Sequence, residues 1–449
     1  MNRRWATPWS LMAVIMVAVI MVVVLAGSAT APSAGALTAP AIDPTLLPAA
    51  AAPGPRQPSV QVETCTLPET AADVPDTTPD PLGFAAVRSL SRGEGQRVAV
   101  IDTGVTRHPR LAHLEAAGDY VVAGDGTTDC DGHGTIVAGI IAATTDLDAP
   151  TGFSGIAPAA TVLTIRQSST KYAPADSPTD VGVGDVLTLA MAVRTAADLG
   201  ATVINISSIA CAAGALHDGA LGAALAYAVD TKDVVVVAAA GNIGGAGRCP
   251  DQPDGAELSW ETATVAASPG WYDDYVLTVG SVDPEGAPSA FSLPGPWVDV
   301  AAPGERVVSL HPSGSGVVDT LPAFGRSMPI SGTSYAAPVV SGLAALVRAR
   351  FPELTAREVM RRIEETAAGD GWNPVTGRGV VDPAAAMSAE TPVTQPDSPR
   401  SAVVVTDAPG SAGPNAGHAR ATAITGAAIC AGLLLCGALI TRVRPHRKR

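Results

Sequence analysis

Aromatic residues are scarce in this chain: they make up 4% of 449 residues, and Ala, Gly and Val dominate instead. Positive charge is also scarce, because the formal net charge is −14 and no basic stripe occurs outside the last few residues. The sequence therefore gives no support for nucleic-acid binding. An acidic surface of this kind mildly favours basic partners, but more often it only keeps a protein soluble.

Cysteine pairs spaced as CxxC are absent, which argues against a zinc site, and we expect neither a metal nor a cofactor. Six cysteines are present. Cys430 and Cys436 lie within an apolar run and are expected to be small packing residues. The other four are even in number and are expected to form two disulfides if this part of the chain is exported: Cys65, Cys130, Cys211 and Cys249.

The N-terminus has the layout of a secretory signal peptide, which we assign to residues 1–36. Arg3 and Arg4 precede an apolar run from Leu11 to Gly27, and small residues suited to a signal peptidase follow directly. The run is slightly long for a signal peptide, so an uncleaved membrane anchor is the alternative.

The C-terminus predicts a transmembrane helix. Residues 421–441 are apolar and uncharged, and a helix of this length spans roughly 30 Å, the thickness of one bilayer core. The basic tail at 442–449 is typical of the cytoplasmic side of a membrane. We therefore expect a single-pass protein of the cell membrane, with its bulk extracytoplasmic and its C-terminus cytoplasmic.

Between these ends the sequence predicts a globular domain over residues 84–387, with a proline-rich N-terminal extension (37–83) before it and a flexible linker (388–420) after it. Short apolar runs alternate with small-residue helical stretches, which is typical of an α/β fold with a mostly parallel sheet covered on both faces. The expected strands are 98–101, 161–165, 202–206, 234–238 and 276–279, and the expected helices are 133–143, 185–199, 216–229, 334–349 and 355–366.

Asp102 stands at the carboxyl end of the first expected strand, in Val98-Ala-Val-Ile-Asp-Thr-Gly. In open parallel sheets, sites form at this end of the strands. A buried carboxylate also needs a hydrogen-bonding partner. Taken alone, this residue could simply cap a turn.

His133 lies between two glycines, directly before a helix of very small residues. Glycines permit close approach of backbone and substrate. A lone histidine is usually a polar surface residue, and we interpret the other six in that way because none has a comparable setting: His108, His113, His217, His311, His418 and His446.

Ser334 opens a long apolar helix in the segment Gly332-Thr-Ser-Tyr-Ala-Ala-Pro338. The free N–H groups and the dipole of a helix N-terminus favour an oxyanion beside this serine. Asn242, which follows an expected strand and Gly241, could donate its amide to the same oxyanion. The simpler interpretations are a helix-capping serine and an asparagine that supports a turn.

Each simpler interpretation is adequate alone, but the combination is not. Asp102, His133 and Ser334 follow the chain order of subtilisin rather than that of chymotrypsin or the α/β-hydrolases. Their motifs resemble the three signature motifs of the subtilase family, and the resemblance covers about residues 84–387. It implies a subtilisin-like three-layer fold and a serine endopeptidase.

The same resemblance implies a role for each residue. Asp102 would orient the imidazole of His133 and stabilise its cation. His133 would act as general base and then as general acid, with Ser334 as the nucleophile. Asn242 and the backbone N–H of Ser334 would form the oxyanion hole.

A narrower resemblance is to the mycosins, actinobacterial subtilases of type VII secretion systems. It rests on the segments Ile165-Arg-Gln-Ser-Ser169, Asp129-Cys-Asp-Gly-His133 and 295–304, and on the layout of both termini. It implies association with a membrane-embedded secretion complex. It also implies that the N-terminal extension wraps the catalytic domain and is not a removable propeptide.

Two disulfides are predicted in this context. Cys65 lies in the extension and Cys130 lies just before His133, so a Cys65–Cys130 bond would hold the extension beside the active site. A second bond, Cys211–Cys249, would join two loops.

Ser207 and Ser208 follow a strand that in subtilases pairs with the substrate backbone, so we expect them at the substrate. The residues after them depart from the usual family continuation, and subsite specificity is not carried over. Asp125, Asp129 and Asp131 form an acidic loop whose spacing is not that of an EF-hand. We interpret it as a solvated loop rather than a calcium site.

Three functions are compatible with these features. The first is an active endoprotease that processes a secreted or complex-associated protein. The second is a structural subunit of the secretion complex whose proteolysis is dispensable, and both can hold together. The third is a stand-alone degradative surface protease.

Overall fold

The computed structural model describes residues 37, 39–71, 80–145, 152–244, 249–252, 258–323 and 325–389. The predicted signal peptide, transmembrane helix and basic tail lie outside these residues, as does the linker beyond residue 389. Within the described part of the chain, no helix is long and apolar enough to cross a bilayer.

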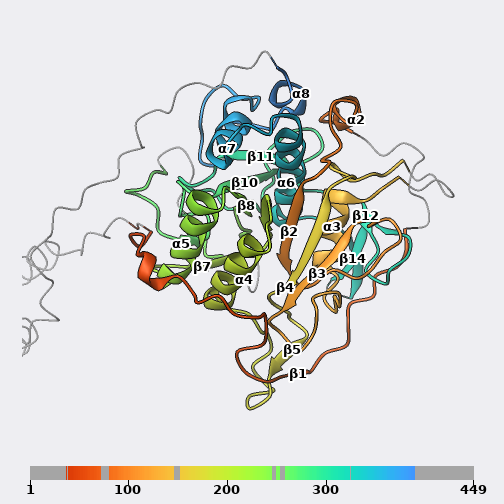
Figure 1. The fold of residues 1–449 in the computed structure, drawn as a ribbon, viewed down its shortest axis with the longest axis vertical. Coiled ribbons are helices and arrows are strands. Elements are labelled where there is room, and N and C mark those ends of the chain that lie inside the picture. The colour runs from red at the N-terminus through yellow and green to blue at the C-terminus, as the bar shows by residue number, and fades with distance from the viewer. Residues whose placement is uncertain are drawn as a thin grey trace, which may run out of the picture. The chain divides into compact units, whose positions relative to one another are not determined.

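A seven-stranded sheet forms the centre of the domain, and all its neighbouring strands are parallel (Figure 1). Most of its residues are buried, which is typical of a parallel sheet that is covered on both faces. In spatial order the strands are β11 (Val300–Pro303), β10 (Leu277–Val282), β8 (Val235–Ala239), β6 (Val203–Ile206), β2 (Arg97–Asp102), β4 (Thr161–Arg166) and β3 (Leu114–Asp119).

Two pairs of helices pack on this sheet. Helices α3 (His133–Ala142) and α6 (Thr333–Arg350) contact each other and the central strands. Helices α4 (Val186–Asp198) and α5 (Gly219–Ala226) form the other pair, and a π-helical turn, η2 (Tyr227–Thr231), continues α5. The subtilisin-like three-layer arrangement expected from the sequence is therefore confirmed.

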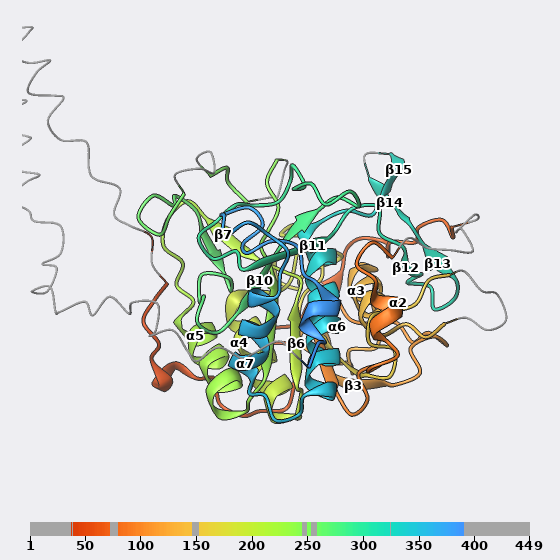
Figure 2. The ribbon, with the colours of Figure 1, turned by 90° about the horizontal axis from the view of Figure 1, so that it is seen from above.

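Smaller elements surround these layers. Helix α7 packs on α6, and the short helices α2 and α8 contact each other. Figure 2 shows the hairpin β14–β15 projecting from the body of the domain. The bounds are η1 (Pro44–Leu46), β1 (Ser59–Gln61), α2 (Phe84–Val87), β5 (Tyr172–Pro174), β7 (Ala210–Ala212), β9 (Ala266–Ser268), β12 (Ser309–Leu310), β13 (Val317–Val318), β14 (Thr320–Ala323), β15 (Arg326–Pro329), α7 (Ala356–Glu365) and α8 (Pro383–Ala386).

The N-terminal extension takes part in the packing. Strand β1 pairs antiparallel with β5, and the Ser59 hydroxyl donates to the carbonyl oxygen of Val121 at 2.5 Å. The packed structure therefore begins upstream of Phe84, where the sequence had suggested that the globular part starts.

The five predicted strands and five predicted helices are all present, with ends that differ by a few residues. The edge strands β3 and β11 were not predicted. β3 has the sequence Leu-Glu-Ala-Ala-Gly-Asp and a register shift between Ala116 and Gly118, so it lacks the apolar run by which the central strands were found.

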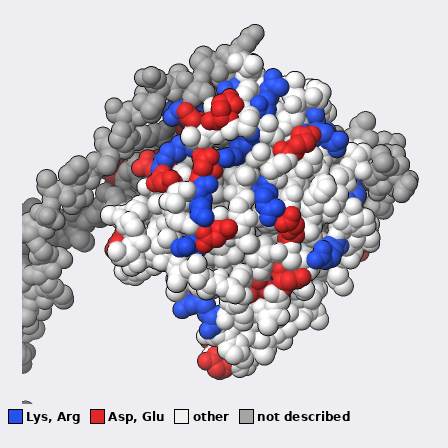
Figure 3. Space-filling model, in the orientation of Figure 1, with Lys and Arg blue, Asp and Glu red and all other residues white. Residues whose placement is uncertain are grey.

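Charge is mixed on the surface. Figure 3 shows acidic and basic side chains interspersed over one face of the domain. Ion pairs of the described residues include Arg194–Asp198 at 2.6 Å and Arg348–Asp233 at 2.9 Å. This face therefore carries no extended stripe of one sign.

Candidate active site

Strand β2 and helix α3 bring Asp102 and His133 together. The Nδ1 atom of His133 lies 2.7 Å from Oδ1 of Asp102, whose side chain is only 2% exposed. Close approach of the two elements depends on Gly134, because a Cβ there would lie 2.1 Å from the carbonyl oxygen of Gly104. Gly132 ends the preceding loop at φ +83°, a conformation that favours glycine.

Five effects act on the pKa of His133. Burial alone lowers it, because an imidazolium is poorly solvated inside a protein. The charge of Asp102, the hydrogen bond to it, and the charges of Asp129 and Asp131 outweigh burial. The pKa of His133 therefore lies above its ordinary value, and the imidazolium is stabilised at this site.

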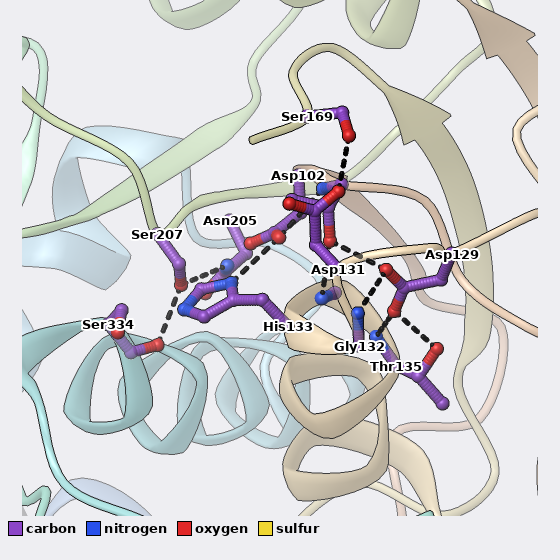
Figure 4. A network of polar contacts seen from close by, with 12 residues as sticks. Asp102, Asp129, Asp131, Gly132, His133, Thr135, Ser169, Asn205, Ser207 and Ser334 are labelled. Carbon is purple, nitrogen blue, oxygen red and sulfur yellow. Dashed lines mark hydrogen bonds and ion pairs between the residues drawn. The ribbon is translucent and has the colours of Figure 1, made fainter. Parts of the chain in front are cut away.

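Ser334 lies in the first turn of α6, and the residue is 9% exposed. The neighbouring Tyr335 has its ring centroid 5.1 Å from that of His133, and Figure 4 draws the imidazole between Asp102 and Ser334. No hydrogen bond joins the Ser334 hydroxyl to His133, both of them described residues. Such catalytic contacts often tighten only in the complex with substrate.

Asn242 is held beside the start of α6. Its Oδ1 accepts from the backbone N–H of Thr333 at 3.0 Å and from the Thr333 hydroxyl at 3.2 Å. Because Oδ1 is occupied in this way, the amide nitrogen is the end of the side chain left for another acceptor. Asn242 therefore lies next to Ser334 in space, because it bonds the residue directly before it.

The side chain of Ser207 is hydrogen-bonded inside the protein. Its hydroxyl donates to the backbone carbonyl of Ser334 at 2.8 Å and accepts from the Asn205 amide at 2.9 Å. Only the backbone of Ser207, and the partly exposed Ser208, remain for the predicted substrate contact. Asn205 was not singled out from the sequence, because a single asparagine in an apolar strand gives no signal of its partners.

The acidic loop is not the solvated loop that the sequence suggested. Asp129 is 8% exposed and accepts hydrogen bonds from Gly132 and Thr135. Asp131 accepts from the Ser169 hydroxyl at 2.5 Å. Asp125 is exposed and Asp131 is half-buried, so of the three carboxylates only that of Asp129 is buried. Among the described residues, no group of acidic, His or Cys side chains is arranged to hold a metal.

Both predicted disulfides are formed. Cys65–Cys130 links the N-terminal extension to the loop before His133, with the Cα atoms 4.4 Å apart. The backbone N–H of Thr66 also donates to the carbonyl oxygen of Cys130, at 2.8 Å. Cys211–Cys249 joins strand β7 to the loop after β8. The backbone N–H of Cys249 also donates to the carbonyl oxygen of Asn242, at 3.0 Å.

Comparisons with known proteins agree with this geometry. Residues 93–389 match the profile of the subtilase family. Mycosin-4 of Mycobacterium tuberculosis is 56% identical over 422 residues, which cover 90% of this chain and 91% of Mycosin-4.

Two solved structures extend the comparison. The MycP3 protease from the type VII (ESX-3) secretion system is 43% identical, with a TM-score of 0.72, and the match covers 79% of this chain and 100% of that one. A chain of an intact ESX-5 inner membrane complex is 37% identical, with a TM-score of 0.74, and the match covers 90% of this chain and 99% of that one. The extent of these matches shows that this chain belongs to the subtilase family of serine proteases and, within it, to the mycosins.

Proposed function

We propose that the protein hydrolyses peptide bonds through a triad of Asp102, His133 and Ser334. The observation that carries the proposal is the 2.7 Å contact between His133 Nδ1 and Asp102 Oδ1, beside the helix that presents Ser334. With Nδ1 bonded to the carboxylate, Nε2 is the ring nitrogen that accepts the proton of the Ser334 hydroxyl. The raised pKa of His133 favours this proton transfer, because it reflects a stabilised imidazolium.

The hydroxyl oxygen of Ser334 would then attack the substrate carbonyl, and the oxyanion would form at the start of α6. The Asn242 amide and the backbone N–H of Ser334 are the donors that we assign to it. His133 would return its proton to the leaving amine, which leaves the acyl group on Ser334. Water would then attack this acyl-enzyme, with His133 taking a proton from the water and giving it to the Ser334 oxygen as the acyl group leaves.

We further propose that the protease domain is extracytoplasmic, anchored by residues 421–441, and associated with a type VII secretion membrane complex. The apolar run followed by a basic tail supports the anchor. The two disulfides support an oxidising compartment. The similarity to a chain of an ESX-5 inner membrane complex supports the partner.

A fluorophosphonate activity probe tests the triad. We expect the full-length protein in detergent to be labelled and the Ser334→Ala variant to stay unlabelled. Ser331→Ala serves as a matched control, because Ser331 is exposed three residues before Ser334 and its hydroxyl accepts from the backbone N–H of Arg306. Equal labelling of wild type and Ser334→Ala would refute the proposal.

A second function is favoured by the similarity to a chain of a membrane complex: a structural subunit whose proteolysis is dispensable. In that case Ser334→Ala should leave secretion intact, whereas deletion of the chain should stop it. Equal loss of secretion in both strains would exclude the structural role. Purification as a lone monomer in mild detergent would instead favour a stand-alone degradative protease.

A further inference from the structure

The carboxylate of Asp129 is a buried acceptor of four hydrogen bonds behind the triad (Figure 4). Its Oδ1 accepts from the Thr103 hydroxyl and from the backbone N–H of Gly132, each at 2.8 Å. Its Oδ2 accepts from the backbone N–H and the hydroxyl of Thr135, at 2.8 and 2.6 Å. Both oxygens are therefore fully used inside the protein.

These donors come from the two elements that carry the catalytic pair. Thr103 follows Asp102 at the end of β2, whereas Gly132 and Thr135 flank His133 at the start of α3. Asp129 thus spans the junction across which His133 reaches Asp102.

The two threonine hydroxyls extend the network in a defined direction. While donating to Asp129, the Thr103 hydroxyl accepts from the backbone N–H of Gly134 at 3.0 Å. The Thr135 hydroxyl likewise accepts from the backbone N–H of Thr106 at 2.9 Å. Each hydroxyl has one hydrogen, and that hydrogen is used on Asp129, so the carboxylate fixes the orientation of both.

We propose that Asp129 is a positioning residue of the active site, which in its ionised form holds the start of α3 against the end of β2 and so sets the His133–Asp102 contact. This inference rests on the proposed triad. Asp129 touches neither the nucleophile nor the peptide bond, and it acts through Thr103, Gly132 and Thr135.

The chemistry of the pocket requires the ionised carboxylate. Each oxygen faces one backbone N–H, which can only donate, and one threonine hydroxyl. The charged or titratable groups that interact with Asp129 across the junction are Asp102, His133 and Tyr335. Burial raises the pKa of Asp129 to about 6, against the effect of its hydrogen bonds, so that the group is ionised at neutral pH and protonated in mild acid.

Asp129→Asn is the direct test. In either orientation of the amide, its NH₂ group faces a backbone N–H, of Gly132 or of Thr135, so two donors meet. We expect kcat to fall about 10- to 100-fold with KM little changed, because a small displacement of a catalytic group is costly. The matched control is Asp125→Asn, because Asp125 is exposed and its carboxylate accepts from the backbone N–H and the hydroxyl of Thr127.

The pH profile separates this role from a merely structural one. In wild type, activity requires a neutral His133 and an ionised Asp129, so log kcat/KM should approach a slope of two on the acid side. In Asp129→Asn the slope should be one, and its midpoint should move to lower pH because one charge that raises the pKa of His133 is gone. An unchanged kcat and an unchanged acid limb in this variant would overturn the proposal.

A second pair of variants decides the matter if Asp129→Asn fails to fold. Thr103→Ser keeps the hydroxyl and should retain near-wild-type kcat, whereas Thr103→Val keeps the shape without the hydroxyl and should lose about 10-fold. Equal activity of the two would also overturn the proposal. A wild-type protein that does not react with a fluorophosphonate would instead refute the triad, which distinguishes the two failures.

Discussion

The hydroxyl of Ser207 donates a hydrogen bond to the backbone carbonyl of Ser334, at 2.8 Å. This bond joins the end of β6 to the first turn of α6. Asn205 is fully buried in β6. Its amide donates to the Ser207 hydroxyl, and its Oδ1 accepts from the Ser341 hydroxyl at 2.8 Å. A chain of polar contacts therefore fixes the helix that presents the nucleophile.

Asn205→Leu tests that chain. Leucine has a similar volume but leaves the Ser207 and Ser341 hydroxyls without one partner each, so the free energy of unfolding should fall by about 1–3 kcal/mol. Urea denaturation followed by tryptophan fluorescence measures the change. Ser208→Ala, at a partly exposed position outside the network, should stay within about 0.5 kcal/mol of wild type. A wild-type stability for Asn205→Leu would show that the network contributes little.

Asn242→Ala tests the oxyanion hole. Removing one preorganised donor should lower kcat by about 10²–10³-fold and leave KM nearly unchanged, because the donor acts on charge that develops only in the transition state. Steady-state hydrolysis of a chromogenic peptide measures both constants. The control is Asn373→Ala, because Asn373 lies in an exposed turn and its side chain bonds Thr376. A rise in KM alone would assign Asn242 to substrate binding instead.

The acid limb of the pH profile reports the protonation of His133 together with that of Asp129. The neutral form of His133 is the base, and its pKa is raised by Asp102, Asp129 and Asp131 despite the lowering effect of burial. Activity should therefore be lost as pH falls through a midpoint above about 6.5, the ordinary value for histidine. Asp131→Asn removes one of these charges and should move the midpoint of kcat/KM to lower pH. A shift to higher pH would contradict this electrostatic assignment.

The Cys65–Cys130 bond closes a segment of 65 residues between the extension and the active-site loop. Replacing both cysteines by alanine should lower the free energy of unfolding by about 4 kcal/mol at most, because the unfolded chain regains loop entropy. The Cys211–Cys249 bond closes a segment of 38 residues, so its removal should cost about 0.5 kcal/mol less. Chemical denaturation of the two double variants tests the order, and no loss of stability in either would contradict it.

The sequence predicted those parts of the molecule that depend on local pattern. Continuous apolar runs located the five central strands, and motifs of glycine and small residues located the elements that carry Asp102, His133 and Ser334. The edge strand β3 escaped because it has no continuous apolar run, which an edge strand does not need. Strand β11 is a short apolar run, Val-Ala-Ala-Pro, that was not assigned to a strand.

The supporting polar contacts could not be predicted, because they join residues far apart in the chain. Asn205 and Ser341 are 136 positions apart, and Ser207 and Ser334 are 127 apart. For Asp129 the available signal was a cluster of acidic residues, which more often marks a solvated loop. Its burial follows from the packing of β2 against α3, which no local pattern records.

Peptide mapping of the fluorophosphonate adduct tests the catalytic unit most directly. We expect the adduct on Ser334 in the wild-type protein and its loss in His133→Ala, with the neighbouring Ser331 unmodified in both. An adduct on another serine, or full modification of Ser334 without His133, would contradict the account.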